Sequence, residues 1–203
     1  LMLRDSGRIQ ESDVRHVNKK RKRQGKVLFE PLYKEIDAIR AMDHFIQVPY
    51  NQQYQPAPGV LVEFHDAGHI LGSAAIHLTI YEDGERKTLW FSGDIGRLDL
   101  PILRDPILPF DADYLLMECT YGDKPHDSVD EAHEHLKIVV NQTLSRGGKV
   151  IIPAFAVGRT QELVYHFNNL MFHKEIPSVP VYVDSPLAVN ITDVFRKHWR
   201  EYD

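Results

Sequence analysis

The chain is poor in cysteine and in long apolar runs and has no excess of positive charge, and each of these features excludes a class of protein. A single cysteine, Cys119, rules out an internal disulfide framework and fits a reducing cytoplasm. No apolar run approaches the roughly 20 residues that span a bilayer, and no signal-like segment opens the chain. We therefore expect a soluble, cytoplasmic protein with no membrane partner.

The net charge of -5 argues against general binding to polyanions, with one local exception. The segment Lys19–Lys26 holds six positive charges in eight positions. Such a run fits either a solvated connecting loop or a surface that attracts phosphate groups, and both interpretations stay open. The chain has neither a G-x-G-x-x-G pattern nor a Walker lysine, so a nucleotide cofactor has little support.

Hydrophobic periodicity divides the chain near residue 122. Before that point we expect a short helix at 12–18, a basic loop and a second helix at 34–45. A proline-containing connector at 48–59 then leads into a series of strands. The strands are expected at 60–64, 74–81, 88–91 and 114–117, with a hairpin turn at 82–85.

After residue 122 the pattern predicts alternating helices and strands. The helices fall at 130–144, 160–172 and 188–199, and the strands at 149–152 and 179–183. This alternation is typical of βαβ units in a parallel, Rossmann-like sheet. The sequence thus predicts an α/β fold with one domain at 1–122 and a second at 123–203.

Three expected strands end in glycine-rich turns that carry a side chain able to bind or orient a metal: His69, Asp94 and Glu118. Because such strand ends gather at one edge of a sheet, we expect the three side chains to converge. Taken singly, His69 also fits a hydrogen-bonded turn residue and Asp94 an Asx turn. Glu118 fits a metal ligand, a carboxylate that orients a histidine, or half of an ion pair, and we favour the second role.

Four other residues invite a chemical interpretation. Cys119 is more typical of a small buried hydrophobe than of a nucleophile, because no activating base lies near it in sequence. His133 and His135 form an H-x-H pattern, but two positions apart on a helix they point to different faces, so we expect exposed helix histidines. Arg159 opens an expected helix, where an arginine and backbone N–H groups can hold a phosphate.

Four segments carry a family resemblance when taken together. The segments are Ala67–Ser73, Ser92–Asp94, Glu118–Gly122 and Pro153–Leu163. In this order they resemble the β-CASP branch of the metallo-β-lactamase superfamily. The chain is most similar there to bacterial and archaeal RNA-processing nucleases related to the endonuclease subunit of the eukaryotic cleavage and polyadenylation factor.

The resemblance implies a fold and a chemistry. The fold would be the C-terminal part of a metallo-β-lactamase αββα core, followed by the start of a Rossmann-like, parallel-sheet β-CASP domain. The activity would be hydrolysis of RNA phosphodiester bonds with two Zn²⁺ ions. His69 would ligate one zinc, Asp94 would bridge both, and Glu118 would support a histidine that donates a proton. Apart from the resemblance, Arg159 and the basic segment are our own candidates for contacts with the RNA backbone.

The chain also departs from the family pattern. The H-x-H-x-D-H ligand loop of the family is expected upstream of residue 1, and two later histidines beyond residue 203. We therefore expect an internal fragment of a longer enzyme that binds metal poorly and is inactive alone. A related hydrolase acting on DNA or a thioester, and a non-catalytic scaffold of the same fold, stay open, as does a homodimer.

Overall fold

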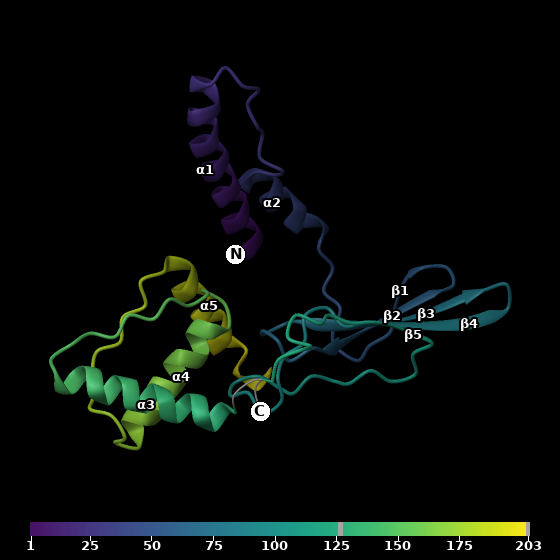
Figure 1. Ribbon diagram of the computed structural model, residues 1–203. Coiled ribbons are helices and arrows are strands. Elements are labelled where there is room, and N and C mark those ends of the chain that lie inside the picture. The colour runs from purple at the N-terminus through teal and green to yellow at the C-terminus, as the bar shows by residue number, and fades with distance from the viewer. Residues whose placement is uncertain (126–127, 202–203) are drawn as a thin grey trace. The chain divides into compact units, whose positions relative to one another are not determined.

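The computed structural model describes residues 1–125 and 128–201 and forms two compact units, Leu1–Gln47 and Val48–Asp203. Figure 1 shows the helices of the first unit and the sheet and helices of the second. Residues 126–127 and 202–203 of the expected second domain lie outside the described residues. No helix within the described ranges has both the length and the apolar character needed to cross a membrane.

The first unit consists of helix α1 (Met2–Arg23), helix α2 (Glu35–Ala41) and a 3₁₀ turn, η1 (Met42–His44). Gly7 lets the two helices approach closely, because a Cβ there would lie 2.8 Å from the backbone nitrogen of Glu35. An ion pair of 2.8 Å between Arg4 and Glu35 joins the same two helices. The expected helix at 34–45 is confirmed as α2 followed by η1.

The expected short helix at 12–18 with a basic loop after it is wrong. Helix α1 is continuous and includes most of the basic run, with Lys20, Arg21, Lys22 and Arg23 in its last turn. Lysine and arginine are good helix formers, and positive charge is favourable at the negative end of the helix dipole. Helix propensity therefore outweighs the repulsion between like charges here.

The second unit begins with a five-stranded sheet in the order β1-β2-β3-β4-β5. Its strands are β1 (Tyr54–Ala57), β2 (Val60–Asp66), β3 (Ala74–Glu82), β4 (Glu85–Phe91) and β5 (Tyr114–Leu116). Strands β1 to β4 pair antiparallel, and β5 joins β4 in parallel. The four expected strands are confirmed, whereas β1 lies where the sequence predicts only a connector.

One face of this sheet is covered by aromatic and imidazole rings. His65 stacks on Trp90 with ring centroids 5.1 Å apart, and Phe110 packs edge-on against both rings. The ring centroid of His77 lies 5.7 Å from that of Trp90, and His77 is the fourth ring of the layer. Trp90 is 1% exposed, and His65 and His77 beside it are also buried, so these three rings form a buried patch on the sheet.

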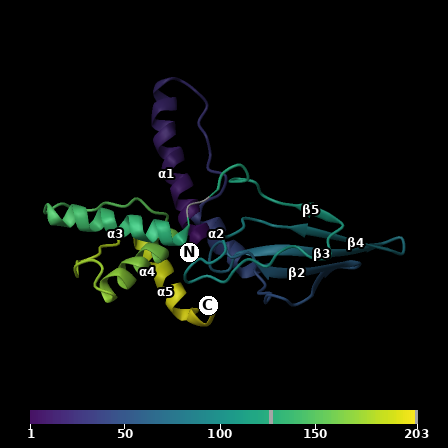
Figure 2. The ribbon, with the colours of Figure 1, turned by 60° about the horizontal axis from the view of Figure 1, so that its bottom comes forward.

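Three helices follow the sheet: α3 (Val129–Ser145), α4 (Arg159–Phe172) and α5 (Pro186–Lys197), with a 3₁₀ turn η2 (Trp199–Glu201) after them. Figure 2 shows the three helices grouped together. Buried Val140, Phe167, Leu170 and Ile176 form the core between α3 and α4. The helices expected from periodicity are thus confirmed, with bounds shifted by one or two residues.

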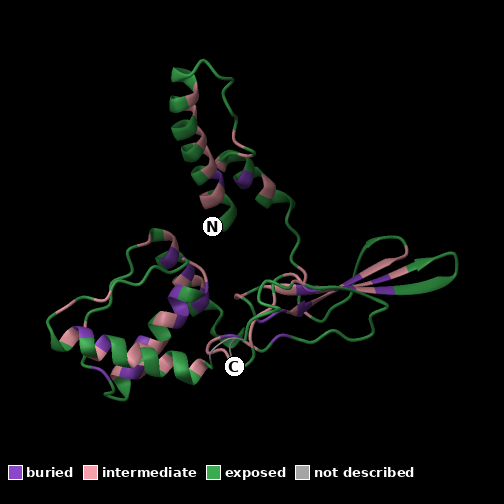
Figure 3. Ribbon diagram, viewed as in Figure 1, coloured by how far each residue is buried: buried purple, intermediate pink, exposed green. Residues whose placement is uncertain are grey.

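The strands expected at 149–152 and 179–183 are not formed among the described residues. Ile151 is 90% exposed and Tyr182 is 86% exposed, and both segments appear mostly green in Figure 3. A parallel strand needs a hydrogen-bonded neighbour, and within the described ranges the parallel pairing is that of β4 with β5. The structure is therefore mixed α/β with a mostly antiparallel sheet, and the described residues after 122 contain helices without the expected parallel sheet.

Candidate active site

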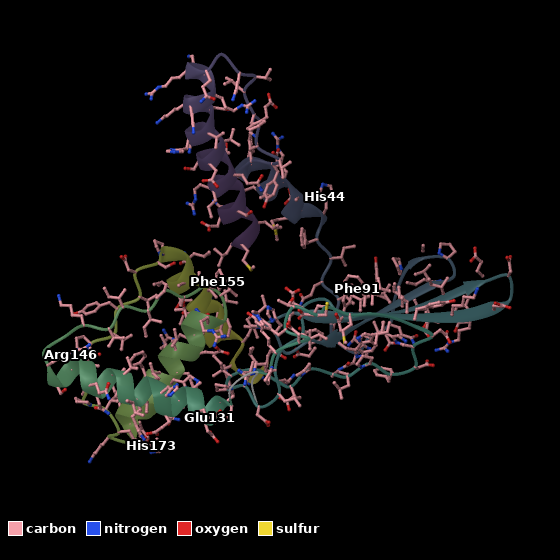
Figure 4. All side chains as sticks on the ribbon, viewed as in Figure 1. His44, Phe91, Glu131, Arg146, Phe155 and His173 are labelled. Carbon is pink, nitrogen blue, oxygen red and sulfur yellow. The ribbon has the colours of Figure 1, made fainter. Side chains whose placement is uncertain are left out.

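The sheet delivers three chain segments to one edge. Strand β2 runs antiparallel to β3, and β3 runs antiparallel to β4, so β2 and β4 point the same way. Strand β5 is parallel to β4, so the C-terminal ends of β2, β4 and β5 all lie at the same edge. Figure 4 labels Phe91, the last residue of β4, at this position. The turns that carry His69, Asp94 and Glu118 begin here.

The turn after β2 is held by side-chain oxygens. The hydroxyl of Ser73 accepts hydrogen bonds from the backbone N–H groups of His69 and Ile70, at 3.1 and 3.2 Å. Asp66 accepts a hydrogen bond of 2.9 Å from the N–H of Gly68. Gly68 has a φ of +61°, which an L-residue adopts only with strain. These contacts fix the backbone from which the His69 imidazole projects.

The turn after β4 lies directly against the turn after β2. Gly96 donates its N–H to the carbonyl of Ala67 at 2.7 Å, and a Cβ on Gly96 would lie 1.7 Å from the carbonyl oxygen of Gly68. This approach brings His69 Nε2 to 3.9 Å from Asp94 Oδ2. Both side chains are open to solvent, with exposed fractions of 44% and 77%.

Glu118 connects the end of β5 to the turn that carries Asp94. Its Oε1 accepts a hydrogen bond of 2.7 Å from the N–H of Ile95, and its Oε2 accepts one of 2.6 Å from the hydroxyl of Thr120. These hydrogen bonds, that of Thr120 foremost, lower the pKa of Glu118, and the charge of His69 adds to the effect. Glu118 is thus an ionised carboxylate that fixes the backbone next to Asp94.

The donor atoms of His69 and Asp94, an imidazole nitrogen and a carboxylate oxygen, are of the kinds that zinc binds. Zinc holds such atoms at about 2.0–2.2 Å, which puts two tetrahedral ligands about 3.3–3.6 Å apart. The 3.9 Å between His69 Nε2 and Asp94 Oδ2 would therefore have to shorten by a few tenths of an ångström around one shared ion. Both oxygens of Glu118 are already occupied by hydrogen bonds, which suits an orienting carboxylate better than a ligand. Across residues 1–125 and 128–201, no three His, Cys, Asp or Glu side chains are placed to hold a metal together.

Arg159 lies at the start of α4, which packs against the His69 turn. A Cβ on Gly158 would lie 3.2 Å from the side chain of Ile70, next to His69. The Arg159 side chain is 65% exposed and forms an ion pair of 2.8 Å with Glu162 of its own helix. The guanidinium is therefore near the edge and accessible, although its charge is partly compensated.

The two histidines of the H-x-H pattern have different environments. His135 is exposed as expected, but His133 is half-buried, and its Nδ1 lies 3.0 Å from Nδ1 of His166 on α4. Burial and the charge of His133 lower the pKa of His166. Both rings line a cavity of about 510 Å³ between α3, α4 and the loop at 99–105. Sequence spacing could not reveal this pair, because its members come from two helices.

Cys119 is exposed, so the expectation of a buried hydrophobe is wrong. Strand β5 ends at Leu116, and the turn that follows it, from 119 to 122, is exposed. Cys119 therefore lies beyond the end of the sheet, in an exposed turn.

Comparison with known proteins matches residues 160–203 to the Beta-Casp domain. The chain is 37% identical over 171 residues to Ribonuclease TTHA0252 of Thermus thermophilus, an alignment that covers 84% of the chain and 38% of the relative. It is 35% identical over 175 residues to an RNase J-like protein of Methanocaldococcus jannaschii, covering 82% and 39%. It is 36% identical over 160 residues to transcription termination factor FttA of a Lokiarchaeum species, covering 77% and 25%.

The aligned part of the chain thus spans between 25% and 39% of the length of these relatives. Two of the three are named as ribonucleases or ribonuclease-like proteins. The aligned region covers most of the chain, and the domain match lies at its C-terminal end. The chain therefore belongs to the β-CASP family.

Proposed function

We propose that this chain is part of a zinc-dependent ribonuclease that hydrolyses RNA phosphodiester bonds. The observation that carries the proposal is the 3.9 Å approach of His69 Nε2 to Asp94 Oδ2 at an exposed sheet edge. The ribonuclease names of two relatives support RNA as the substrate. When bound, zinc would supply Lewis-acid polarisation of the phosphodiester.

In this proposal each residue of the edge has a distinct role. His69 and Asp94 would hold the metal. Glu118 is a positioning residue, because its carboxylate holds Ile95, the neighbour of Asp94, at 2.7 Å. Glu118 would also orient the proton-donating histidine that the family resemblance implies. Arg159 is exposed at the start of α4 and would contact the RNA backbone.

The domain organisation follows the same proposal. Residues 1–122 would be part of a metallo-β-lactamase αββα core, and residues 123–203 part of a Rossmann-like β-CASP domain. The exposed apolar segments at 149–152 and 179–183 would then be strands of that domain's parallel sheet. A solved structure of the complete protein in which either segment pairs with antiparallel neighbours would contradict this assignment.

The test is RNA cleavage by the complete protein. Single-stranded RNA would be incubated with the wild type, with Asp94→Ala, and with Asp13→Ala as a control for loss of an exposed carboxylate on α1. We expect Asp94→Ala to lose at least about 100-fold in rate, because loss of mere supporting residues around a metal typically costs 10–100-fold. Undiminished cleavage by Asp94→Ala, or cleavage of DNA in preference to RNA, would overturn the proposal.

A further inference from the structure

The C-terminal end of α1 carries a ring of basic residues, 19–23, which together with Lys26 we call the crown. The protein as a whole has a net charge of -5. Five consecutive basic residues, 19–23, cover more than one full turn of a helix with 3.6 residues per turn, so their charges surround the axis. Lys26 follows just beyond the helix. Between Lys19 and Leu32 the sequence contains one acidic residue, Glu30.

These charges are available to a partner. Lys19, Lys20, Lys22 and Arg23 are exposed, and the ion pairs of the described residues within this unit lie at the other end of α1. The charge is therefore not neutralised by the fold. Because the run is helical, the backbone positions that carry these side chains are held at fixed spacing, which a flexible loop would not achieve.

An aromatic ring stands beside the crown on a rigid backbone. Asn18 donates its amide N–H to the carbonyl of Phe29 at 2.8 Å and accepts the N–H of Phe29 at 2.9 Å, as a neighbouring strand would. The Arg21 guanidinium lies 3.9 Å from the Phe29 ring centroid and donates to the carbonyl of Val27 at 2.6 Å. Phe29 nevertheless keeps 52% of its surface exposed.

We propose that this surface, the residues 19–23 and 26 with Phe29, binds single-stranded RNA. Its cations would contact successive phosphates, and a base would stack on the Arg21–Phe29 pair, the combination of basic residues and an aromatic ring that suits single strands. A flat anionic membrane is a poorer partner, because it would reach only part of a ring of charges around a helix axis. This inference rests on the proposed function in one respect: the RNA strand bound here would be the substrate of the proposed ribonuclease.

The test measures binding separately from cleavage. A fluorescently labelled single-stranded RNA would be titrated by anisotropy at several salt concentrations into the complete protein carrying Asp94→Ala. Two further changes, Lys22→Gln with Arg23→Gln, remove two charges of the crown. The matched control, Arg196→Gln with Lys197→Gln, removes two exposed charges from the last turn of α5. Circular dichroism would verify that both variants fold.

We expect the crown variant to bind more weakly and its log–log salt slope to fall by about 1.4, since each phosphate contact on a single strand contributes roughly 0.7. The α5 control should keep the parent slope. Phe29→Leu should weaken binding about 5-fold or more with no change of slope, because it removes stacking and not charge. An equal loss in the crown variant and the control would overturn the inference.

Two further binding measurements distinguish RNA from other ligands. Tighter binding to single-stranded DNA than to RNA would overturn the RNA assignment. Crown-dependent binding to phosphatidylserine vesicles, without crown-dependent RNA binding, would point to a membrane instead. If cleavage fails while the crown variants behave as expected, the proposed function falls and this inference stands. If cleavage occurs and the crown variant binds RNA normally, this inference falls alone.

Discussion

Gly96 and Gly68 set the distance between the two candidate metal ligands. Gly96 donates its N–H to Ala67, and no room exists for a side chain on Gly96, because a Cβ would lie 1.7 Å from the Gly68 carbonyl oxygen. The 3.9 Å separation of His69 and Asp94 thus depends on a contact between two backbone segments. A methyl group at this contact would push the two turns apart.

Gly96→Ala should therefore damage the site more than the fold. We expect a loss of about 1–3 kcal/mol in unfolding free energy from overpacking, and a fall of about 10–100-fold in RNA cleavage. Gly84→Ala is the matched control, because Gly84 has a φ of +82° but open space around it, so alanine there adds strain far from the site. Denaturant melts and cleavage rates would be compared. Wild-type activity in Gly96→Ala would contradict the role given to this contact.

His65 is a buried imidazole that favours the neutral form. Its Nδ1 contacts the side-chain oxygen of Asn51 at 2.8 Å, and its Nε2 has no hydrogen-bond partner among the residues that the structure describes. Burial lowers the pKa of His65, Glu63 acts in the opposite direction, and His77 lowers the pKa further. The folded protein therefore binds a proton at this site less readily than the unfolded chain does.

Stability should fall on acidification for this reason. The contribution of His65 is fully present above the unfolded pKa of about 6.5 and is lost as the pH falls toward the lower folded pKa. Thermal melts at roughly pH 7.5 and 5.5 would show a smaller drop for His65→Phe, which cannot titrate, than for the wild type. The exposed His135→Gln should keep the wild-type drop. Equal drops in all three proteins would contradict this account.

At the scale of single residues, the sequence identifies side chains whose position follows from a strand end. His69, Asp94 and Glu118 each come just after a strand, and antiparallel or parallel pairing then brings them to one edge. The contact of His133 with His166 has no such signal, since it depends on how α3 packs against α4. The packing of the two helices alone determines whether His133 and His166 meet.

At the scale of elements, α3 is the helix that local chemistry predicts best. Ser128 accepts a hydrogen bond of 3.1 Å from the N–H of Glu131, and the Glu131 carboxylate accepts one of 2.9 Å from the N–H of Ser128. The bond from the Ser128 N–H is also the main cause of the lowered pKa of Glu131. These short-range contacts fix the first turn of α3 without help from the rest of the fold.

Ser128→Ala should cost about 1 kcal/mol of unfolding free energy, the usual value of a lost N-terminal cap. The measurement is the denaturant midpoint of the variant against the wild type. Ser145→Ala, at the other end of α3, is a suitable control, because its hydroxyl donates to the carbonyl of Gln142 three residues earlier in the same helix and caps no helix start. A Ser128→Ala midpoint no lower than that of Ser145→Ala would show that the cap is not needed.

One helix and two expected strands differ from the sequence-based prediction, for opposite reasons. In α1 the run of like charges suggests a loop, yet helix propensity and the dipole carry the helix through to Arg23. At 149–152 and 179–183 the apolar β-branched residues suggest strands, but a strand exists only where another strand pairs with it.

At the scale of the whole molecule, the sequence-predicted break near residue 122 stays a prediction. The structure separates Leu1–Gln47 from the rest, and the sheet and the three later helices belong to one compact unit. Within that unit, buried Leu103 of the loop at 99–105 packs on Ile191 and Phe195 of α5. The candidate site lies where the sheet edge meets the start of α4.

The central claim is that His69 and Asp94 hold metal together. The most direct measurement is the zinc content of the complete purified protein, determined by mass spectrometry for the wild type, His69→Ala, Asp94→Ala and the control His135→Ala. We predict a lower ratio of zinc to protein in both site variants and an unchanged ratio in the control. Wild-type zinc content in His69→Ala and Asp94→Ala would contradict the claim, whatever the cleavage assay shows.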